Sequence, residues 1–189
     1  RPEGIATDET DIWILDRKNK DVYRYANAAE NTSGSQNAAS SFALDGANSK
    51  PKGITTDGSS IWVVNDGKSG DRVFKYNLAG NLLGSWTIDG ANAKPSGIAM
   101  DGGDLWIVDG GNDSVFQYVD AAGLPSDNQV AAASFTLDLN NSHAEGIATV
   151  ASGPVNQPPM TMNDGDGNYD ELAGLSFSFD QDVNVSVDA

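Results

Sequence analysis

The sequence predicts an all-β fold built from one repeated unit of four short strands. Three observations support this prediction. A Gly-Ile stretch followed by an Asp-containing turn and a Trp-containing apolar run recurs at an interval of roughly 45 residues, a period typical of repeat architectures. The copies begin at Gly4, Gly53 and Gly97, and a fourth begins at Gly146 and then loses the pattern. No segment has the apolar spacing of an amphipathic helix, so we expect almost no helix.

Within the first copy, four segments have the composition of strands. They are residues 4–8, residues 11–16 with the run Ile-Trp-Ile-Leu, residues 21–25 with Val-Tyr-Arg-Tyr, and residues 41–45. Such β-branched and aromatic residues favour strands. The second copy repeats the last two segments at 72–76 and 84–89, and the third repeats them at 114–118 and 133–138. The Asp-Gly pairs at 57–58 and 101–102 favour tight turns between the first and second strands.

Four antiparallel strands, a period in the forties and a Trp in each second strand describe a blade of a β-propeller. The predicted blades cover about residues 4–48, 53–92 and 97–141, followed by the first strand of a fourth, so a partial propeller occupies residues 1–150. The pattern Pro-x-Gly-Ile-x-x-Asp-Gly-x-x-Ile-Trp-Val-Val-Asp with a following Val-Phe-x-Tyr strand resembles NHL-type propeller repeats. Complete propellers have about 4–8 blades. We therefore expect a piece of a longer or processed protein, in which further blades or other copies close the ring.

The composition changes after the repeats. Residues 151–171 form a Pro- and Asp-rich linker, and residues 172–189 alternate polar and apolar residues as a strand does. The run Asn-Gln-Pro-Pro before this alternation resembles the opening of a bacterial surface-protein Ig-like module. The resemblance implies an extracellular or cell-surface location.

The charge limits the partners. Lys and Arg number 11 against 27 Asp and Glu, a net charge of −16, which disfavours nucleic acid and anionic membranes. No run is long enough to insert into a bilayer. There is no cysteine, so thiol chemistry is excluded.

Polar residues at the strand ends are the candidate ligand-binding residues. Asp16, Asn65 and Asp109 end the second strand of each copy, and their oxygens could converge on a central channel and hold Ca²⁺. Alternatively, they accept backbone N–H groups in the turns that follow, which their presence in every repeat favours. A second equivalent position, in the loop that leads to each first strand, carries Lys50, Lys94 and His143. His143 is the only histidine and has no recognisable catalytic partner.

The run from Asn163 to Glu171 is the candidate metal site. Its oxygen-bearing residues at alternate positions, as in a Ca²⁺ loop, are Asp164, Asp166, Asn168 and Asp170. Tyr169 replaces the glycine that an EF-hand loop needs, so a solvated acidic linker is the favoured interpretation. We expect no cofactor and at most weak Ca²⁺ binding.

These features favour a non-catalytic extracellular binding or scaffolding module that acts through its propeller loops on a protein or carbohydrate ligand. The alternative is a propeller-type lyase or lactonase with a metal in the central channel. NHL-like lyases resemble this chain in fold, but they use histidine-based sites that these repeats do not contain. Catalytic residues are therefore not assigned.

Overall fold

The computed structural model describes residues 1–68, 70–123 and 127–149. The chain divides into two compact units, Arg1–Ser152 and Gly153–Ala189. The predicted linker, the Ig-like segment and the candidate metal residues Asp164, Asp166, Asn168 and Asp170 lie outside the described residues. The described residues all belong to the first unit.

Three four-stranded antiparallel sheets form this unit, each with its strands in chain order. Sheet 1 holds β1 (Pro2–Thr7), β2 (Ile12–Asp16), β3 (Asp21–Tyr25) and β4 (Ser40–Ala43). Sheet 2 holds β5 (Pro51–Thr56), β6 (Ser60–Asn65), β7 (Arg72–Asn77) and β8 (Leu82–Thr87). Sheet 3 holds β9 (Pro95–Asp101), β10 (Asp104–Asp109), β11 (Ser114–Tyr118) and β12 (Ala133–Thr136). The predicted all-β fold is confirmed, and the one helical element of the described ranges is the 3₁₀ turn η1 (Ala121–Gly123).

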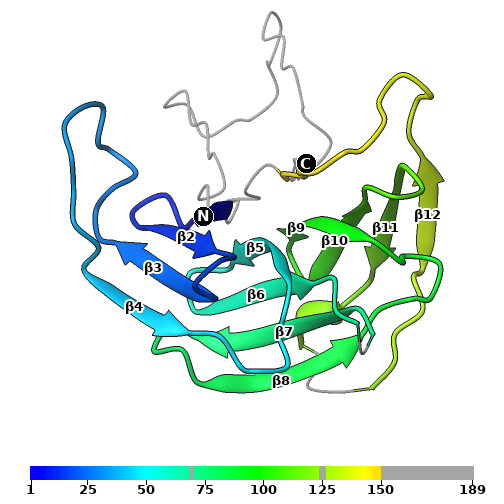
Figure 1. The fold of residues 1–189 in the computed structure, drawn as a ribbon, viewed down its shortest axis with the longest axis horizontal. Coiled ribbons are helices and arrows are strands. Elements are labelled where there is room, and N and C mark those ends of the chain that lie inside the picture. Colours follow the sequence, from blue (N-terminus) through cyan, green and yellow to red (C-terminus); the bar gives the residue numbers. More distant parts are fainter. Residues whose placement is uncertain (69, 124–126, 150–189) are drawn as a thin grey trace, which may run out of the picture. The chain divides into compact units, whose positions relative to one another are not determined.

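The first strands of the sheets lie beside one another, with β5 between β1 and β9, and the last strands lie farthest from them (Figure 1). Glycine at the middle of each first strand allows this approach. A Cβ added to Gly53 would lie 2.8 Å from the Ile98 nitrogen and 2.9 Å from the Gly97 Cα. Because backbone atoms block the space on the neighbouring strand, no side chain fits there without moving a sheet.

Apolar residues pack between neighbouring sheets in two clusters. The first cluster joins sheet 1 to sheet 2 and includes Trp13, Leu15, Val63, Phe74 and Tyr76. The second joins sheet 2 to sheet 3 at the repeat-equivalent positions; it includes Trp62, Val64, Ile107, Phe116 and Tyr118. Trp13 and Trp62 are packing residues of these clusters, since each is 1% exposed.

The fourth copy corrects one prediction, because residues 146–149 are not a strand. This segment does lie against β9, where the first strand of a fourth sheet would lie. The Ser96 Oγ donates a hydrogen bond to the Ala144 carbonyl at 2.6 Å, and the Thr149 hydroxyl donates to the Met100 carbonyl. The first strands β1, β5 and β9 each form their ladder only with the second strand of their own sheet. The described part of the fourth copy contains no such second strand.

Candidate functional site: the inner-strand cluster

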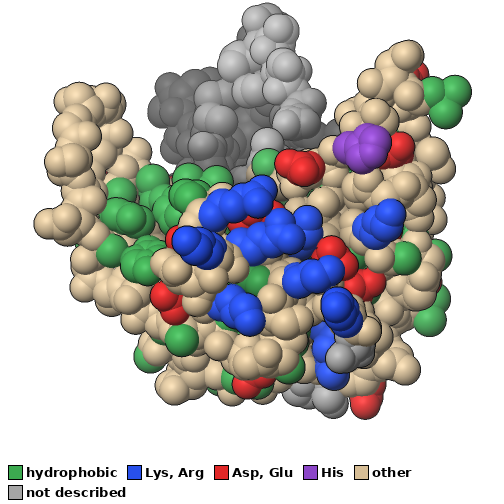
Figure 2. All heavy atoms as spheres, in the orientation of Figure 1, with side chains coloured by type: hydrophobic (Ala, Val, Ile, Leu, Met, Phe, Trp, Pro, Cys, Tyr) green, Lys and Arg blue, Asp and Glu red, His purple; other side chains and the backbone are tan. Residues whose placement is uncertain are grey.

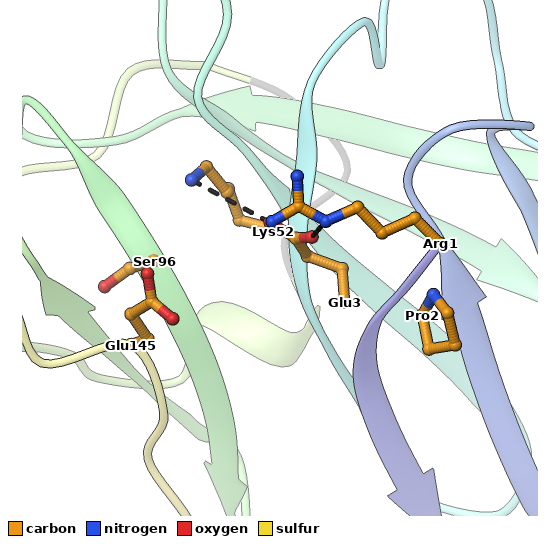
Figure 3. Close-up of a pocket in the computed structure, with 6 residues that line it drawn as sticks. All are labelled: Arg1, Pro2, Glu3, Lys52, Ser96 and Glu145. Carbon is orange, nitrogen blue, oxygen red and sulfur yellow. Dashed lines mark ion pairs between the residues drawn. The ribbon is translucent and has the colours of Figure 1, made fainter.

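The residue before the first Gly of each copy varies between Glu, Lys and Ser, although the residues that follow it agree between copies. It is Glu3 in the first copy, Lys52 in the second, Ser96 in the third and Glu145 in the fourth. The structure brings all four to one cavity of about 160 Å³, which Arg1 and Pro2 also line (Figure 3). We call Arg1, Glu3, Arg17, Lys52, Ser96 and Glu145 the inner-strand cluster.

Glu3 is the centre of this cluster. Its carboxylate lies 2.8 Å from Arg17 Nη1, 3.5 Å from Arg1 Nε and 4.0 Å from Lys52 Nζ. The Glu3 side chain is 13% exposed, and those of Lys52 and Arg17 are 20% and 30% exposed. Arg1 is 71% exposed, so the partly buried part of the cluster is Glu3 with Lys52 and Arg17, where charges interact more strongly than on an open surface.

Basic side chains also gather on one face of the molecule. Figure 2 shows Lys and Arg side chains gathered near the middle of the face it presents. The whole chain has a net charge of −16, so this gathering is a local reversal of sign. Such a surface attracts an anionic group over a distance set by the ionic strength.

The strand-end residues predicted to bind a ligand hold loops together in this structure. Asn65 and Asp109 are each 1% exposed. The Asn65 Oδ1 accepts a hydrogen bond from the Lys50 backbone at 2.6 Å, and the Asp109 Oδ2 accepts one from the Lys94 backbone at 2.9 Å. Asp109 Oδ1 also accepts from the backbones of Gly111 and Asn112. These contacts match the alternative interpretation, in which the oxygens satisfy turn N–H groups.

The third equivalent residue, Asp16, is partly exposed, and its Oδ1 accepts a hydrogen bond from the Asn19 backbone at 2.8 Å. Lys50 is half-buried, with its Nζ 3.9 Å from the Asp66 carboxylate. Lys94 is exposed, and its aliphatic chain lies against Gly111. His143 is exposed, and its backbone nitrogen donates to Asp113 Oδ1 at 2.6 Å. None of these predicted residues lines the cavity of the inner-strand cluster.

Across the described ranges, no group of three or more His, Cys, Asp or Glu side chains is placed to hold a metal ion. The same ranges contain no helix of the length and apolarity that crossing a membrane requires.

Comparison with solved structures places this geometry in a known architecture. Virginiamycin B lyase from Staphylococcus aureus superposes with a TM-score of 0.55 at 17% identity, over 78% of this chain and 45% of the lyase. The fold is propeller-like. Hydrazine synthase of Kuenenia stuttgartiensis matches with a TM-score of 0.53 at 16% identity, over 77% of this chain and 38% of that one. A streptogramin B lyase structure matches with a TM-score of 0.50 at 17% identity, over 73% and 41%.

This chain therefore spans less than half the length of each of these propeller-like structures. At such identities the likeness concerns the fold alone. No family model matches the sequence, and no curated protein matches it.

Proposed function

We propose that this chain is a non-catalytic binding or scaffolding module of β-propeller type, and that its ligand is an acidic segment of a partner protein. The observation that carries the proposal is the excess of cations around Glu3 in the inner-strand cluster. Arg1, Arg17 and Lys52 pair with Glu3, and Glu145 lines the same cavity, so the cluster holds three cations against two carboxylates. A carboxylate side chain brought by a partner supplies the missing negative charge, and the cavity of about 160 Å³ has room for one such group.

The position of the cluster in the repeats supports a binding role. Positions that maintain the fold, such as the first-strand glycines and the second-strand tryptophans, agree between copies. The residues before those glycines differ in charge, although they occupy the same place in each sheet. A ligand that contacts several sheets at once requires different groups from each of them, whereas a structural role requires the same group.

The proposal includes an extracellular or cell-surface location, which the likeness of the Asn-Gln-Pro-Pro run and residues 172–189 to a surface-type Ig-like opening supports. An enzyme with a channel metal receives less support from the geometry. The oxygens of Asn65 and Asp109 accept backbone hydrogen bonds, so metal binding through them would leave loop N–H groups without partners.

Calorimetric titration with an oligo-glutamate peptide tests this function. We expect binding that weakens as salt rises, and a loss of tenfold or more on Lys52→Gln. The matched control is Lys68→Gln, which removes the same charge from the exposed β6–β7 loop. If both variants lose the same affinity for the peptide, binding depends on the net charge of the chain and not on the cluster, which contradicts the proposal. Tighter binding of polygalacturonate than of the peptide would assign the site to an acidic carbohydrate.

A further inference from the structure

The two contacts between sheets in this chain repeat each other in detail. In the first, Phe42 of sheet 1 packs on Tyr76 of sheet 2, with ring centroids 5.7 Å apart. In the second, Trp86 of sheet 2 packs on Tyr118 of sheet 3 at 5.1 Å. Each contact thus joins an aromatic residue on the fourth strand of one sheet to a Tyr at the end of the third strand of the next.

The hydroxyl of this Tyr also fixes a loop of the preceding sheet. The Tyr76 hydroxyl accepts hydrogen bonds from the Asp45 backbone at 3.1 Å and the Asn48 amide at 3.4 Å. Tyr118 accepts the same pair from Asp89 and Asn92, at 3.1 and 3.3 Å. Asn48 and Asn92 are both 0% exposed. We call this arrangement the tyrosine latch: a Tyr hydroxyl that binds an Asp-x-x-Asn loop of the neighbouring sheet.

A long loop adds to the second contact. Residues 127–129 of the β11–β12 loop of sheet 3 lie beside the end of β8 of sheet 2, where the Thr87 backbone donates to Asp127 and accepts from Gln129. The Ala131 backbone also donates to Asp89 Oδ2. The β3–β4 loop of sheet 1 is equal in length to the β11–β12 loop.

Both halves of a third latch are present at the two outer faces of the described sheets. On sheet 1, Tyr25 occupies the place of Tyr76 and Tyr118 in the strand register. On sheet 3, the loop from Asp138 to Asn141 has the Asp-x-x-Asn pattern. This loop is already folded like its counterparts. The Asn140 backbone nitrogen donates to Asp138 Oδ1 at 2.8 Å. The equivalent bonds, from the Ala47 nitrogen to Asp45 Oδ1 and from the Ala91 nitrogen to Asp89 Oδ1, have the same length.

The apolar residues of these outer faces are exposed where their counterparts are buried. On sheet 1, Ile5 is 63% exposed, whereas the equivalent Ile54 and Ile98 are each 4% exposed. Ile5 and Tyr25 line an open groove of about 460 Å³ together with Ile12, Ile14 and Ala28 and part of the β3–β4 loop. On sheet 3, Phe135 is 54% exposed, whereas its counterpart Trp86 is 1% exposed.

The sequence beside β9 identifies the occupant that fits. Residues 145–149, which lie against β9, read Glu-Gly-Ile-Ala-Thr, and residues 3–7 of β1 read the same. The place beside β9 therefore accepts β1 of another copy with no change of side chains. Tyr76 packs on Phe42 and accepts a hydrogen bond from the loop that begins at Asp45. With β1 beside β9 of the other copy, Tyr25 has the same position relative to Phe135 and to the loop from Asp138 to Asn141.

We propose that the outer face of sheet 1 docks on the outer face of sheet 3 of a second copy of this chain, with β1 replacing residues 145–149 beside β9. The latch then forms between Tyr25 of one copy and Asp138 and Asn141 of the other. Two copies joined head to tail at both ends supply six sheets, within the range of about 4–8 blades that closed propellers have, whereas three copies would exceed it. This inference does not depend on the proposed ligand.

Sedimentation velocity with the whole chain tests the proposal through two blocking variants. Ile5→Arg blocks the face of sheet 1, and Phe135→Arg blocks the face of sheet 3; both residues are exposed, so each variant should fold. We expect the unmodified chain to form a dimer and each variant alone to be monomeric at the same concentration. A mixture of the two variants should form a one-to-one dimer, because each retains the face that the other has lost.

The control is Leu83→Arg, at a residue of β8 that is 50% exposed; it should leave the dimer intact. A wild-type chain that stays monomeric at high concentration contradicts the proposal. A dimer that survives both blocking substitutions also contradicts it and assigns association to another surface. Dimerisation of the Phe135→Arg variant alone would show that two sheet-1 faces pair with each other, which overturns the head-to-tail arrangement.

The latch itself has a finer test. Asn141→Ala should weaken dimerisation by roughly 25-fold, because it removes one hydrogen bond from each of the two latches in the dimer. Tyr25→Phe removes the acceptor of both latch bonds and should weaken dimerisation at least as much, and the double variant should be little weaker than Tyr25→Phe alone. Tyr23→Phe is the matched control, since it removes a half-buried hydroxyl from the same strand. Independent effects that multiply in the double variant would show that Tyr25 and Asn141 do not bind each other.

Discussion

At the residue scale, this chain uses polar side chains mainly to fix loops. Asn48 and Asn92 are fully buried, and each donates to a Tyr of the next sheet. Asn65 and Asp109 are equally buried and accept backbone hydrogen bonds. A buried polar group that loses such a partner costs about 1–3 kcal/mol. The strand-end residues therefore recur because each sheet needs the same loop support.

The buried hydroxyl of Tyr118 predicts a loss of stability in alkali. Burial raises the pKa of Tyr118 to about 12, against about 10 in an unfolded chain. The folded state thus keeps a proton that the unfolded state releases. The protonated Tyr118 hydroxyl therefore contributes on the order of 2 kcal/mol to the free energy of unfolding. This contribution is complete below pH 10 and is lost as the pH rises to about 12.

Denaturant melts between pH 8 and pH 12 check this expectation. Tyr118→Phe should be less stable at pH 8 and should lose less stability than the unmodified chain as the pH rises. Burial raises the pKa of Tyr76 as well, so part of the pH dependence remains. Tyr23→Phe is the control and should lose stability with pH as the unmodified chain does. The expectation fails if the free energy of unfolding of Tyr118→Phe falls with pH as steeply as that of the control.

At the element scale, the sequence was enough to predict the strands but not their surroundings. The runs of β-branched and aromatic residues and the Asp-Gly turns predicted the twelve strands of the described residues to within a few residues, because such side chains favour a packed sheet. The patterns treated Trp13, Trp62 and Trp106 as equivalent. Trp106 is only partly buried, whereas the other two are 1% exposed. Burial depends on whether another sheet covers the face, and a repeat does not contain that information.

The first strands carry a prediction about close approach. Gly53→Ala should lower the free energy of unfolding by about 1–3 kcal/mol, the usual cost of an extra methyl group in a packed core. The reason is that its Cβ would lie within 3 Å of backbone atoms of Gly97 and Ile98.

Urea melts provide the comparison, with Gly90→Ala as the control. A Cβ at Gly90 meets no atom within 4 Å, so that variant should differ little from the unmodified chain. Equal stability of the two variants would mean that sheets 2 and 3 can separate at their first strands without cost.

At the scale of the whole molecule, the repeat pattern predicted the wrong site. Asp16, Asn65 and Asp109 recur at one position of the repeats and indicated a ligand site, whereas the inner-strand cluster lies at a position that varies in charge. That position holds Glu3, Lys52, Ser96 and Glu145, and its variation between aligned repeats is the sequence signal of the cluster. Their meeting in one cavity could not have been predicted without the arrangement of the sheets.

Association of copies also predicts how thermal stability depends on concentration. A partner that binds only the folded state stabilises it by mass action. If the head-to-tail dimer forms, a tenfold rise in protein concentration should raise the Tm of the unmodified chain by a few degrees. The Tm of Ile5→Arg should stay constant over the same range. A concentration-independent Tm for both would argue against coupling between folding and assembly.

The tyrosine latch has a consequence for how such a chain can change in length. Each latch joins one repeat to the next, with the Asp-x-x-Asn loop in one copy and the Tyr in the following copy. Residues 45–54 and 89–98 agree at eight of ten positions. Deletion or duplication of one whole repeat between these segments would remove or add one sheet, and the new junction would again place an Asp-x-x-Asn loop before a sheet that carries the Tyr. A chain of this type can therefore change its number of sheets while each junction keeps both halves of a latch.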